Sequence, residues 1–434
     1  MKTKYRIGFC FYYNHELCKV IGIIITEKAQ ILYKVSSILN KSVYYIILNQ
    51  AQILKDRVFY NIRSIIGHND CIFYFLLGGP QSGKSYSVTD FYCSQQVKYG
   101  TPFYWIRLTD AQAGKLLNNN AEKLVDPDLR RKYDLDLVTS GTNVYNVTQR
   151  SQPDKKTGKC KVVKKELFAR VLNLSTFYGD KGSGFYDKDY KGWYNIAIDE
   201  FQREKGERKT FDILYALVRE LENLVRATKS KIRVFFLGNT LEEASDVLCG
   251  LGFVPEKFGR FKLVKNKKKL HQYLKELNAA KTDAEVQAVQ EKYRHIDFGK
   301  RAVIDYMEPS DAYRTMRKGS IADILLPNNS QYTNVIDTDR SLIYKGKLIS
   351  PHLVIKFSKD KSDWYTIWDN NCITQFKGEK KPVIAMRPYI DELFDSKLRD
   401  TVIQSFDTRS YVFRNLITFK RFQNEIMILK PRKA

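Results

Sequence analysis

The sequence has no long apolar run and no regular arrangement of cysteines. Its uninterrupted apolar stretches are short, as in VIGIII at residues 20–25 and CIFYFLLG at 71–78, whereas a membrane-spanning helix needs about 20 apolar residues. The first residues are basic, but Asn14, His15 and Glu16 interrupt the apolar stretch that follows, so we expect neither a signal peptide nor a membrane span. The seven cysteines are scattered, odd in number and without a CxxC pair, which indicates reduced thiols rather than disulfides or a zinc site.

Acidic residues are too few to balance the basic ones. The 434 residues include 73 Lys and Arg but only 48 Asp and Glu, which gives a formal net charge of +25. Such an excess favours a polyanionic partner, either nucleic acid or an anionic membrane surface, and we expect no membrane partner. With 43% hydrophobic and 13% aromatic residues, the chain can bury a sizeable core, and its length predicts two or three domains of about 150 residues.

Apolar strands alternate with helical stretches from residue 71 onward. The predicted apolar strands are 71–78, 103–107, 193–199 and 232–238, and two β-rich runs, 142–148 and 161–174, flank a polar turn. Apolar strands separated by helices predict an α/β fold with a mainly parallel, doubly wound sheet. The turn between the two β-rich runs predicts a hairpin.

Changes in composition and hydrophobic pattern along the sequence predict four regions. These are an N-terminal extension of unassigned role at 1–54, an α/β domain at 55–255, a basic and helical linker subdomain at 256–325, and a smaller α+β domain at 326–434. Within the linker, residues 257–275 hold eight Lys or Arg and no acid.

The segment GGPQSGKS at 78–85 fits the pattern G-x-x-x-x-G-K-[ST]. It follows an apolar strand and opens a helical stretch, the context in which this pattern binds phosphates. Lys84 would reach the β- and γ-phosphates, and Ser85 would offer a hydroxyl to Mg²⁺ at a helix N-terminus that favours anions. We therefore predict ATP contacts from Gly78, Gly79, Pro80, Gln81, Ser82, Gly83, Lys84, Ser85 and Tyr86.

A second candidate element is the run YNIAIDE at 194–200. An apolar strand that ends in two acids can present Asp199 to Mg²⁺ and Glu200 to the attacking water as general base. The pair lies about 115 residues after the phosphate loop, with the strand 103–107 between them. This arrangement favours ATP hydrolysis coupled to motion over phosphate transfer to a small acceptor.

Several other residues have both a functional and a structural explanation. Arg226 could act as an arginine finger in a neighbouring subunit or satisfy the carbonyls at a helix end. Asn239 could contact the γ-phosphate or simply form a turn. Lysines of the hairpin could contact DNA phosphates or form a solvated face, and the candidates are Lys155, Lys156, Lys159 and Lys161. The basic run 257–275 has the same two explanations.

From about residue 55 the chain resembles the DNA-packaging ATPases of phi29-type small tailed phages. The resemblance is carried by DRVFYNIRSII, GGPQSGKSYS, KYGTPFYWIR, NLSTFYGDK, IDEFQREK and VRATKSKIRVFFLGNT, which occur in this order. It covers about 190 residues well, and YVFRNLITFKRF resembles the C-terminal end of the family more weakly. Residues 1–54 have no counterpart in the family, and the hairpin at 142–174 is longer and more basic.

The resemblance implies an ASCE-type P-loop ATPase that uses ATP and Mg²⁺ to move double-stranded DNA into a procapsid. It implies a homopentameric ring in the host cytoplasm, transiently at the portal vertex, with a structural RNA between motor and capsid. It also implies an RNase H-like C-terminal domain without nuclease activity. The implied phosphate, metal and catalytic residues are Lys84, Ser85, Asp199 and Glu200, and those acting across a subunit interface are Arg226 and Lys181.

Two other functions remain compatible with the sequence. A terminase-like motor with a working nuclease would need two or three carboxylates around two metal ions about 4 Å apart. The available acids show no spacing that picks out such a set, and they are Asp337, Asp339, Asp360, Asp363 and Asp369. A DNA helicase or repair ATPase would share every motif of the first domain.

Overall fold

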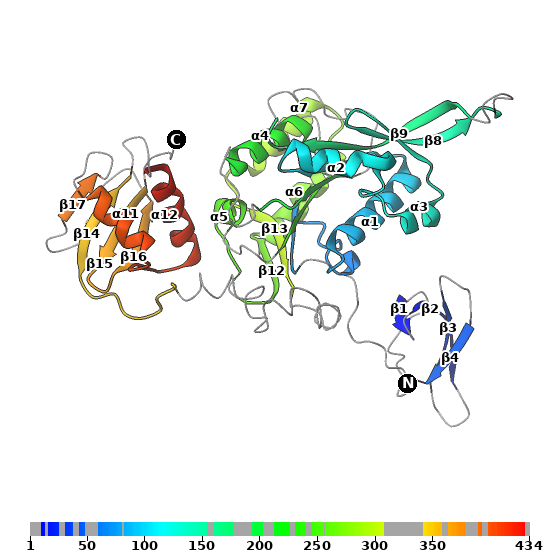
Figure 1. Ribbon diagram of the computed structural model, residues 1–434. Helices are drawn as coiled ribbons and strands as arrows, with labels where there is room; N and C mark the ends of the chain where they lie inside the picture. Colours follow the sequence, from blue (N-terminus) through cyan, green and yellow to red (C-terminus); the bar gives the residue numbers. More distant parts are fainter. Residues whose placement is uncertain are drawn as a thin grey trace.

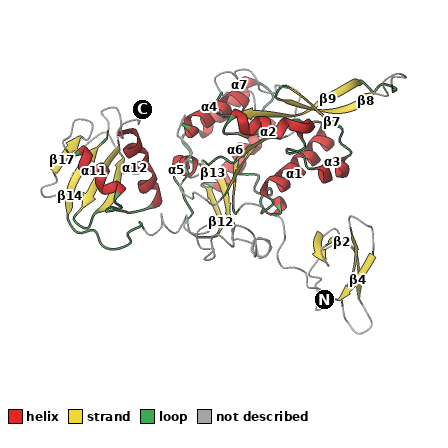
Figure 2. Ribbon diagram, in the orientation of Figure 1, coloured by secondary structure: helices red, strands yellow, loops and turns green. Residues whose placement is uncertain are grey.

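Residues 10–13, 16–25, 31–37, 43–47, 60–79, 82–153, 160–176, 193–202, 212–225, 231–239, 245–255, 257–307, 342–357, 363–377, 389–392 and 398–429 are described by the computed structural model. These residues form three sheets of four, nine and five strands, with helices against the two larger ones (Figure 1). In Figure 2 the strands of each sheet are yellow and the helices red.

The nine-stranded sheet is parallel in its centre and antiparallel at its edges. Its strands, in spatial order, are β12 (Gly259–Val264), β13 (Gly299–Tyr306), β5 (Phe73–Leu77), β11 (Ile232–Gly238), β10 (Tyr194–Asp199), β6 (Phe103–Arg107), β9 (Val162–Asn173), β8 (Asn143–Arg150) and β7 (Leu137–Ser140). The strands from β13 to β9 run parallel, whereas β12, β8 and β7 pair antiparallel. The predicted mainly parallel sheet and the hairpin at 142–174 are therefore confirmed.

Helices cover both faces of this sheet, as a doubly wound fold requires. The elements on one face are α1 (Lys84–Tyr99), α2 (Asp110–Ala121) and α3 (Pro127–Tyr133), and those on the other are α4 (Ile213–Val225) and α5 (Asp246–Leu251). Successive residues of one strand alternate between the two cores, since Tyr74 and Leu76 join the first and Phe75 and Leu77 the second. None of the described helices is long and apolar enough to cross a membrane.

The nine-stranded sheet extends beyond the predicted domain boundary at residue 255. Strand β12 pairs with β13, and β13 pairs with the central strand β5. Between them, α6 (Lys267–Ala279) and α7 (Asp283–Tyr293) form a helical hairpin. The boundary drawn from sequence therefore cuts through one sheet. Arg260 and Lys262 alternate with Phe261 and Leu263 in β12, which is a strand pattern, but the basic run 257–275 was assigned to the helical linker that follows it.

The C-terminal sheet has the order β17–β14–β15–β16–β18. Its strands and helices are β14 (Pro351–Lys356), β15 (Asp363–Trp368), β16 (Cys372–Lys377), β17 (Tyr389–Glu392), α11 (Arg399–Asp407), β18 (Val412–Phe413) and α12 (Leu416–Leu429). An antiparallel meander with β17 parallel beside its first strand is the arrangement expected of the first four strands of an RNase H-like sheet. Strand β18 instead lies parallel to β16.

A separate four-stranded antiparallel meander lies at the N-terminus. It consists of β1 (Cys10–Tyr13), β2 (Glu16–Ile25), β3 (Ile31–Ser37) and β4 (Val43–Ile47), paired in sequence order. The weak periodicity of residues 1–54 did not predict it, because apolar residues occupy successive positions and hide the two-residue strand pattern.

The C-terminal helix α12 contacts α5 of the nine-stranded sheet. The Asn424 side chain donates to the Asp246 carboxylate at 2.7 Å, and Arg421 donates to the carbonyl of Cys249 at 3.2 Å. Leu416 packs against Cys249 in a small buried cluster. These contacts join the C-terminal sheet and its helices to the helix that follows β11.

Replacing Phe422 with Ala should unfold the C-terminal sheet and spare the nine-stranded one. Phe422 is fully buried, and its ring centroid lies 5.1 Å from that of Phe357 and 5.2 Å from that of Tyr365. Loss of the Phe422 ring should lower the free energy of unfolding of this sheet by about 3–5 kcal/mol. Hydrogen exchange should then speed up in residues 351–377 but not in 73–77. The exposed Met427 on the same helix provides the control, since Met427→Ala should leave both rates unchanged.

Candidate nucleotide site

The predicted phosphate loop joins β5 to α1 and closes around its own lysine. Gly83 at the helix N-cap has φ 79°, a left-handed conformation that favours glycine. The Lys84 ammonium donates to the carbonyls of Gly78 and Gly79, both at 2.9 Å, and to Ser82 Oγ at 3.0 Å. The loop thus holds a buried cation at a helix N-terminus, the arrangement expected of a phosphate site. Pro80 and Gln81 lie outside the described residues.

Burial gives Lys84 unusual electrostatics. The residue is only 6% exposed, and burial lowers the pKa of Lys84 to about 8, although the carboxylates of Asp199 and Glu200 oppose this. A phosphate anion beside the ammonium would favour its charged form. The site is therefore suited to a ligand that carries several negative charges.

Ser85 and Asp199 meet at the end of β10. The Ser85 hydroxyl donates to Asp199 Oδ1 at 3.3 Å. Burial raises the pKa of Asp199, although Arg107 and Lys84 lower it. A hydroxyl and a carboxylate beside a phosphate loop are the oxygen ligands that Mg²⁺ uses with nucleotides. Both residues predicted as metal ligands therefore lie together.

Glu200 turns out of the sheet immediately after Asp199. Its φ of 54° lies in the left-handed region, which is rare for a residue other than glycine, and its N–H donates to the Leu237 carbonyl at 2.9 Å. The Glu200 side chain is 46% exposed, whereas that of Asp199 is 5% exposed. The chain direction thus places one acid inside the protein and its neighbour where water reaches it.

Arg107 bridges the two acids, and sequence reasoning did not find it. Its guanidinium forms an ion pair with Asp199 at 2.9 Å and another with Glu200. Arg107 ends β6, the parallel neighbour of β10. The only sequence signal was an arginine at the end of the predicted strand 103–107, and the order of strands in the sheet was needed to place it beside the acids.

Asn239 completes the edge of the site. In the sheet, β11 lies between β5 and β10. Strand β6 comes between β5 and β10 in the sequence, but in the sheet it lies on the other side of β10. The Asn239 side-chain oxygen accepts from Lys84 at 3.4 Å. Just before it, a Cβ on Gly238 would lie 2.8 Å from the Phe201 ring. Glycine at this position therefore lets the ends of β11 and β10 approach closely.

The remaining predicted residues are distributed as follows. Tyr86 lies on the first turn of α1 with an exposed side chain. Lys161 is exposed at the outer end of the hairpin, where its N–H donates to Ser151 Oγ at 2.9 Å. The predictions that fall outside the described residues are Lys155, Lys156, Lys159, Lys181 and Arg226.

The hairpin of β8 and β9 extends away from the body of the sheet (Figure 1). Residues 161–165 are all exposed, so both faces of the ribbon meet solvent there. Arg150, at the outer end of β8, pairs with Asp136 at 2.6 Å, and the Lys165 ammonium lies 4.1 Å from the centre of the Tyr145 ring. The ribbon therefore presents cationic side chains far from the hydrophobic cores.

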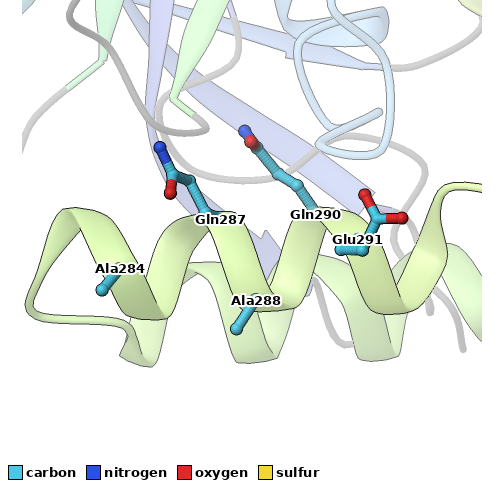
Figure 3. A pocket seen from close by; sticks show the side chains of 5 residues that line it. All are labelled: Ala284, Gln287, Ala288, Gln290 and Glu291. Atoms are coloured by element: carbon cyan, nitrogen blue, oxygen red, sulfur yellow. The ribbon is translucent and has the colours of Figure 1, made fainter.

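A shallow hollow on α7 is a different feature (Figure 3). The residues that line it all belong to this helix, and they are Ala284, Gln287, Ala288, Gln290 and Glu291. None of them belongs to the phosphate loop or to the acid pair. Within the described parts of the chain, no three His, Cys, Asp or Glu side chains come together as a metal-binding group.

Comparison with known proteins finds phage packaging proteins. No family model matches the sequence. Two curated relatives, from Bacillus phage PZA and Bacillus phage phi29, are each named DNA packaging protein. Each is 22% identical to this chain over 205 residues, which are 47% of this chain and 53% of the relative. The match thus spans about half the length of these relatives.

Solved structures extend the similarity of fold. A chain of the bacteriophage phi29 viral genome packaging motor assembly superposes with a TM-score of 0.50 at 16% identity, covering 86% of this chain and 99% of that one. The N-terminal domain of the phi29 DNA packaging ATPase is 22% identical with a TM-score of 0.35, covering 46% of this chain and 88% of that one. In sequence the chain is thus similar, over about half of its length, to DNA packaging proteins of these Bacillus phages, and in fold it is similar to a chain of the phi29 packaging motor assembly.

Proposed function

We propose that this chain is the ATPase of a viral genome-packaging motor that moves double-stranded DNA into a procapsid. One observation carries the proposal: Lys84, Asp199 and Glu200 converge at the carboxyl edge of a parallel sheet. Ligands of α/β proteins bind at this edge. The names of these relatives, which refer to DNA packaging, support the choice of motor.

The cofactors would be ATP and Mg²⁺. ATP supplies the phosphoanhydride bond whose hydrolysis drives movement. Lys84 and the backbone of the phosphate loop would hold the β- and γ-phosphates, while Ser85 and Asp199 would hold the metal ion. Asn239, already within reach of Lys84, is the side chain placed to contact the γ-phosphate.

Glu200 would act as the general base because it is the exposed acid of the pair. In the structure the Glu200 carboxylate is occupied by an ion pair with Arg107, which also pairs with the buried Asp199. For hydrolysis, Glu200 must exchange Arg107 for the attacking water, so we propose that Arg107 controls when the base is available.

The motor would be a homo-oligomeric ring, which we propose to be a pentamer at the portal vertex. Arg226 and Lys181 would act across its interfaces, as the family resemblance implies. The net charge of +25 and the exposed lysines of the hairpin suit a DNA backbone, and also a structural RNA. The fold shared with a chain of a packaging motor assembly supports the ring.

A nuclease-bearing motor is less well supported. The first strand of the C-terminal sheet, PHLVIK, carries no carboxylate. Asp363 accepts a hydrogen bond from Gln375 at 2.7 Å, and Asp369 pairs with His352, so the contacts seen for these two candidates are not with another acid. Asp337, Asp339 and Asp360 lie outside the described residues. Strand separation without a procapsid would instead identify a helicase or repair ATPase.

Lys84→Ala and Glu200→Gln should both abolish hydrolysis, by different routes. The first removes the charge that binds the phosphates, so ATP affinity should fall. The second keeps the shape of the base but not its basicity, so ATP should bind and remain uncleaved. Steady-state ATPase assays with and without duplex DNA, together with equilibrium nucleotide binding, test both. Near wild-type hydrolysis by Glu200→Gln would mean that another group is the base.

Arg107→Lys should raise kcat measured without DNA several-fold, with little change in ATP affinity, because Glu200 is then free of the ion pair that withholds it. Lysine keeps the charge but lacks the planar fork that contacts two carboxylates at once. Arg150→Lys is the matched control, because Arg150, at the outer end of β8, also makes a forked contact, to Asp136. An Arg107→Lys enzyme with the kcat of the unmodified chain would show that the bridge between the acids has no role in turnover.

DNA binding should weaken steeply with salt and show no sequence preference. Each phosphate neutralised contributes about 0.9 to the slope of log affinity against log salt. Changing Lys155, Lys156 and Lys159 to Ala should therefore lower that slope by up to about three. A control that removes the same charge from exposed lysines of α1 and of the α2 region changes Lys98, Lys115 and Lys123 to Ala. Equal slopes for both triple variants, measured by fluorescence anisotropy on random-sequence duplex, would contradict a DNA contact by the hairpin.

A further inference from the structure

The main chain of Tyr60 is hydrogen-bonded to the phosphate loop and to the first turn of α1. Its N–H donates to the Ser82 carbonyl at 2.8 Å, and its own carbonyl accepts a hydrogen bond from the Ser87 hydroxyl. Ser82 lies in the phosphate loop, and Ser87 lies on the first turn of α1. One residue that precedes the sheet therefore holds the chain on both sides of Lys84.

The Tyr60 side chain is anchored to the edge of the sheet. Its hydroxyl donates to Asp305 Oδ2 at 2.8 Å, and Arg260 donates to the same oxygen at 2.6 Å. Burial and the negative charge of Asp305 raise the pKa of Tyr60, so the hydroxyl stays protonated and remains a donor. Arg260 also donates to the carbonyl of Ser64 at 2.7 Å, which ties the short helix η1 (Ile62–Ser64) to β12.

The anchor belongs to strands that lie directly beside the phosphate loop. Asp305 of β13 is opposite Leu76 of β5 in the parallel register. Immediately after β13, the Met307 N–H donates to the Leu77 carbonyl at 2.8 Å, and a Cβ added to Gly78 would lie 2.9 Å from Met307 Cε. The phosphate loop is thus contacted both by Tyr60, which precedes β5, and by Met307, which follows β13.

We propose that Tyr60, Asp305 and Arg260 form a clamp that positions the phosphate loop and so sets its affinity for ATP. The proposal rests on nucleotide binding by this loop, as argued above. These three side chains make no contact with Lys84, so they are positioning residues. A phosphate loop that is already held in its binding conformation loses less conformational entropy when ATP binds, so its affinity for ATP is higher.

Tyr60→Phe in the full chain tests the clamp, because it removes the anchoring hydroxyl and keeps the ring. Losing a buried hydrogen bond to a charged group should raise the Kd for Mg²⁺-ATPγS about tenfold. Asp305→Asn should have a similar effect. Turnover at saturating ATP should stay within about twofold for both variants, since the acids and Arg107 are untouched, so the change should appear in KM and not in kcat.

Tyr74→Phe is the matched control. Tyr74 lies on β5, and its hydroxyl donates to the carbonyls of His68 and Cys71, at the end of the strand away from the phosphate loop. This variant should lower Tm but leave Kd unchanged. Ser87→Ala removes one of the two hydrogen bonds to the Tyr60 main chain and should also raise the Kd for Mg²⁺-ATPγS. It provides an independent test if Tyr60→Phe folds poorly.

The double variant Tyr60→Phe/Asp305→Asn should bind about as weakly as either single variant, because both remove the same interaction. Additive losses would overturn a shared clamp. So would unchanged Kd values for Tyr60→Phe and Ser87→Ala, or a rise in Kd for Tyr74→Phe as large as that for Tyr60→Phe. Absence of ATPγS binding by the unmodified chain would overturn the proposed function, and the clamp with it.

Discussion

The candidate site depends on keeping the buried carboxylate of Asp199 charged. In a low-dielectric interior an unpaired carboxylate is costly and becomes protonated instead. Arg107 and Lys84 oppose this effect from two sides, one at the end of β6 and the other in the phosphate loop after β5. The sheet must therefore hold β5, β11, β10 and β6 in order, so that the two cations meet the acid from neighbouring strands. Packing of both faces by helices maintains that order.

The strand order also connects the site with surfaces far from it. Strand β9 begins in the exposed basic ribbon and ends at Asn173, which is opposite Arg107 in the parallel register. One continuous strand thus runs from the candidate DNA contact to the neighbour of the residue that pairs with both acids. On the other side of the site, the helix α5 that follows β11 and Asn239 contacts α12 of the C-terminal region. Tyr60 and Met307 border the phosphate loop itself. The basic ribbon is therefore connected with the site through β9, and the C-terminal region through the contact of α12 with α5.

Most of the site could be predicted because its pieces are local in sequence. Lys84 and Ser85 belong to one loop, and Asp199 and Glu200 end one apolar strand, so motif and strand pattern were enough to choose them. Arg107 could not be chosen, since its role follows from β6 being beside β10. The placement of β12 and β13 in the same sheet, and the N-terminal meander, were also missed. The strand pattern of β12 is short and lies inside a basic run that was assigned to the helical linker, and in the meander apolar residues adjoin without alternation, so the sequence pattern did not identify the buried face there.

By itself, the sequence determined the α/β class, the phosphate loop, the acid pair and the cationic character of the chain, because propensity, hydrophobic pattern and charge act over short stretches. Only the tertiary structure decided which strands are neighbours, and with them the pairing of Arg107 with two acids and of Tyr60 with Asp305. Those two contacts join residues separated by 93 and 245 positions, respectively, counting to the far acid Glu200 in the first case. Pairing of parallel strands is non-local, so the chain must fold before such partners come within the few ångströms that a hydrogen bond requires.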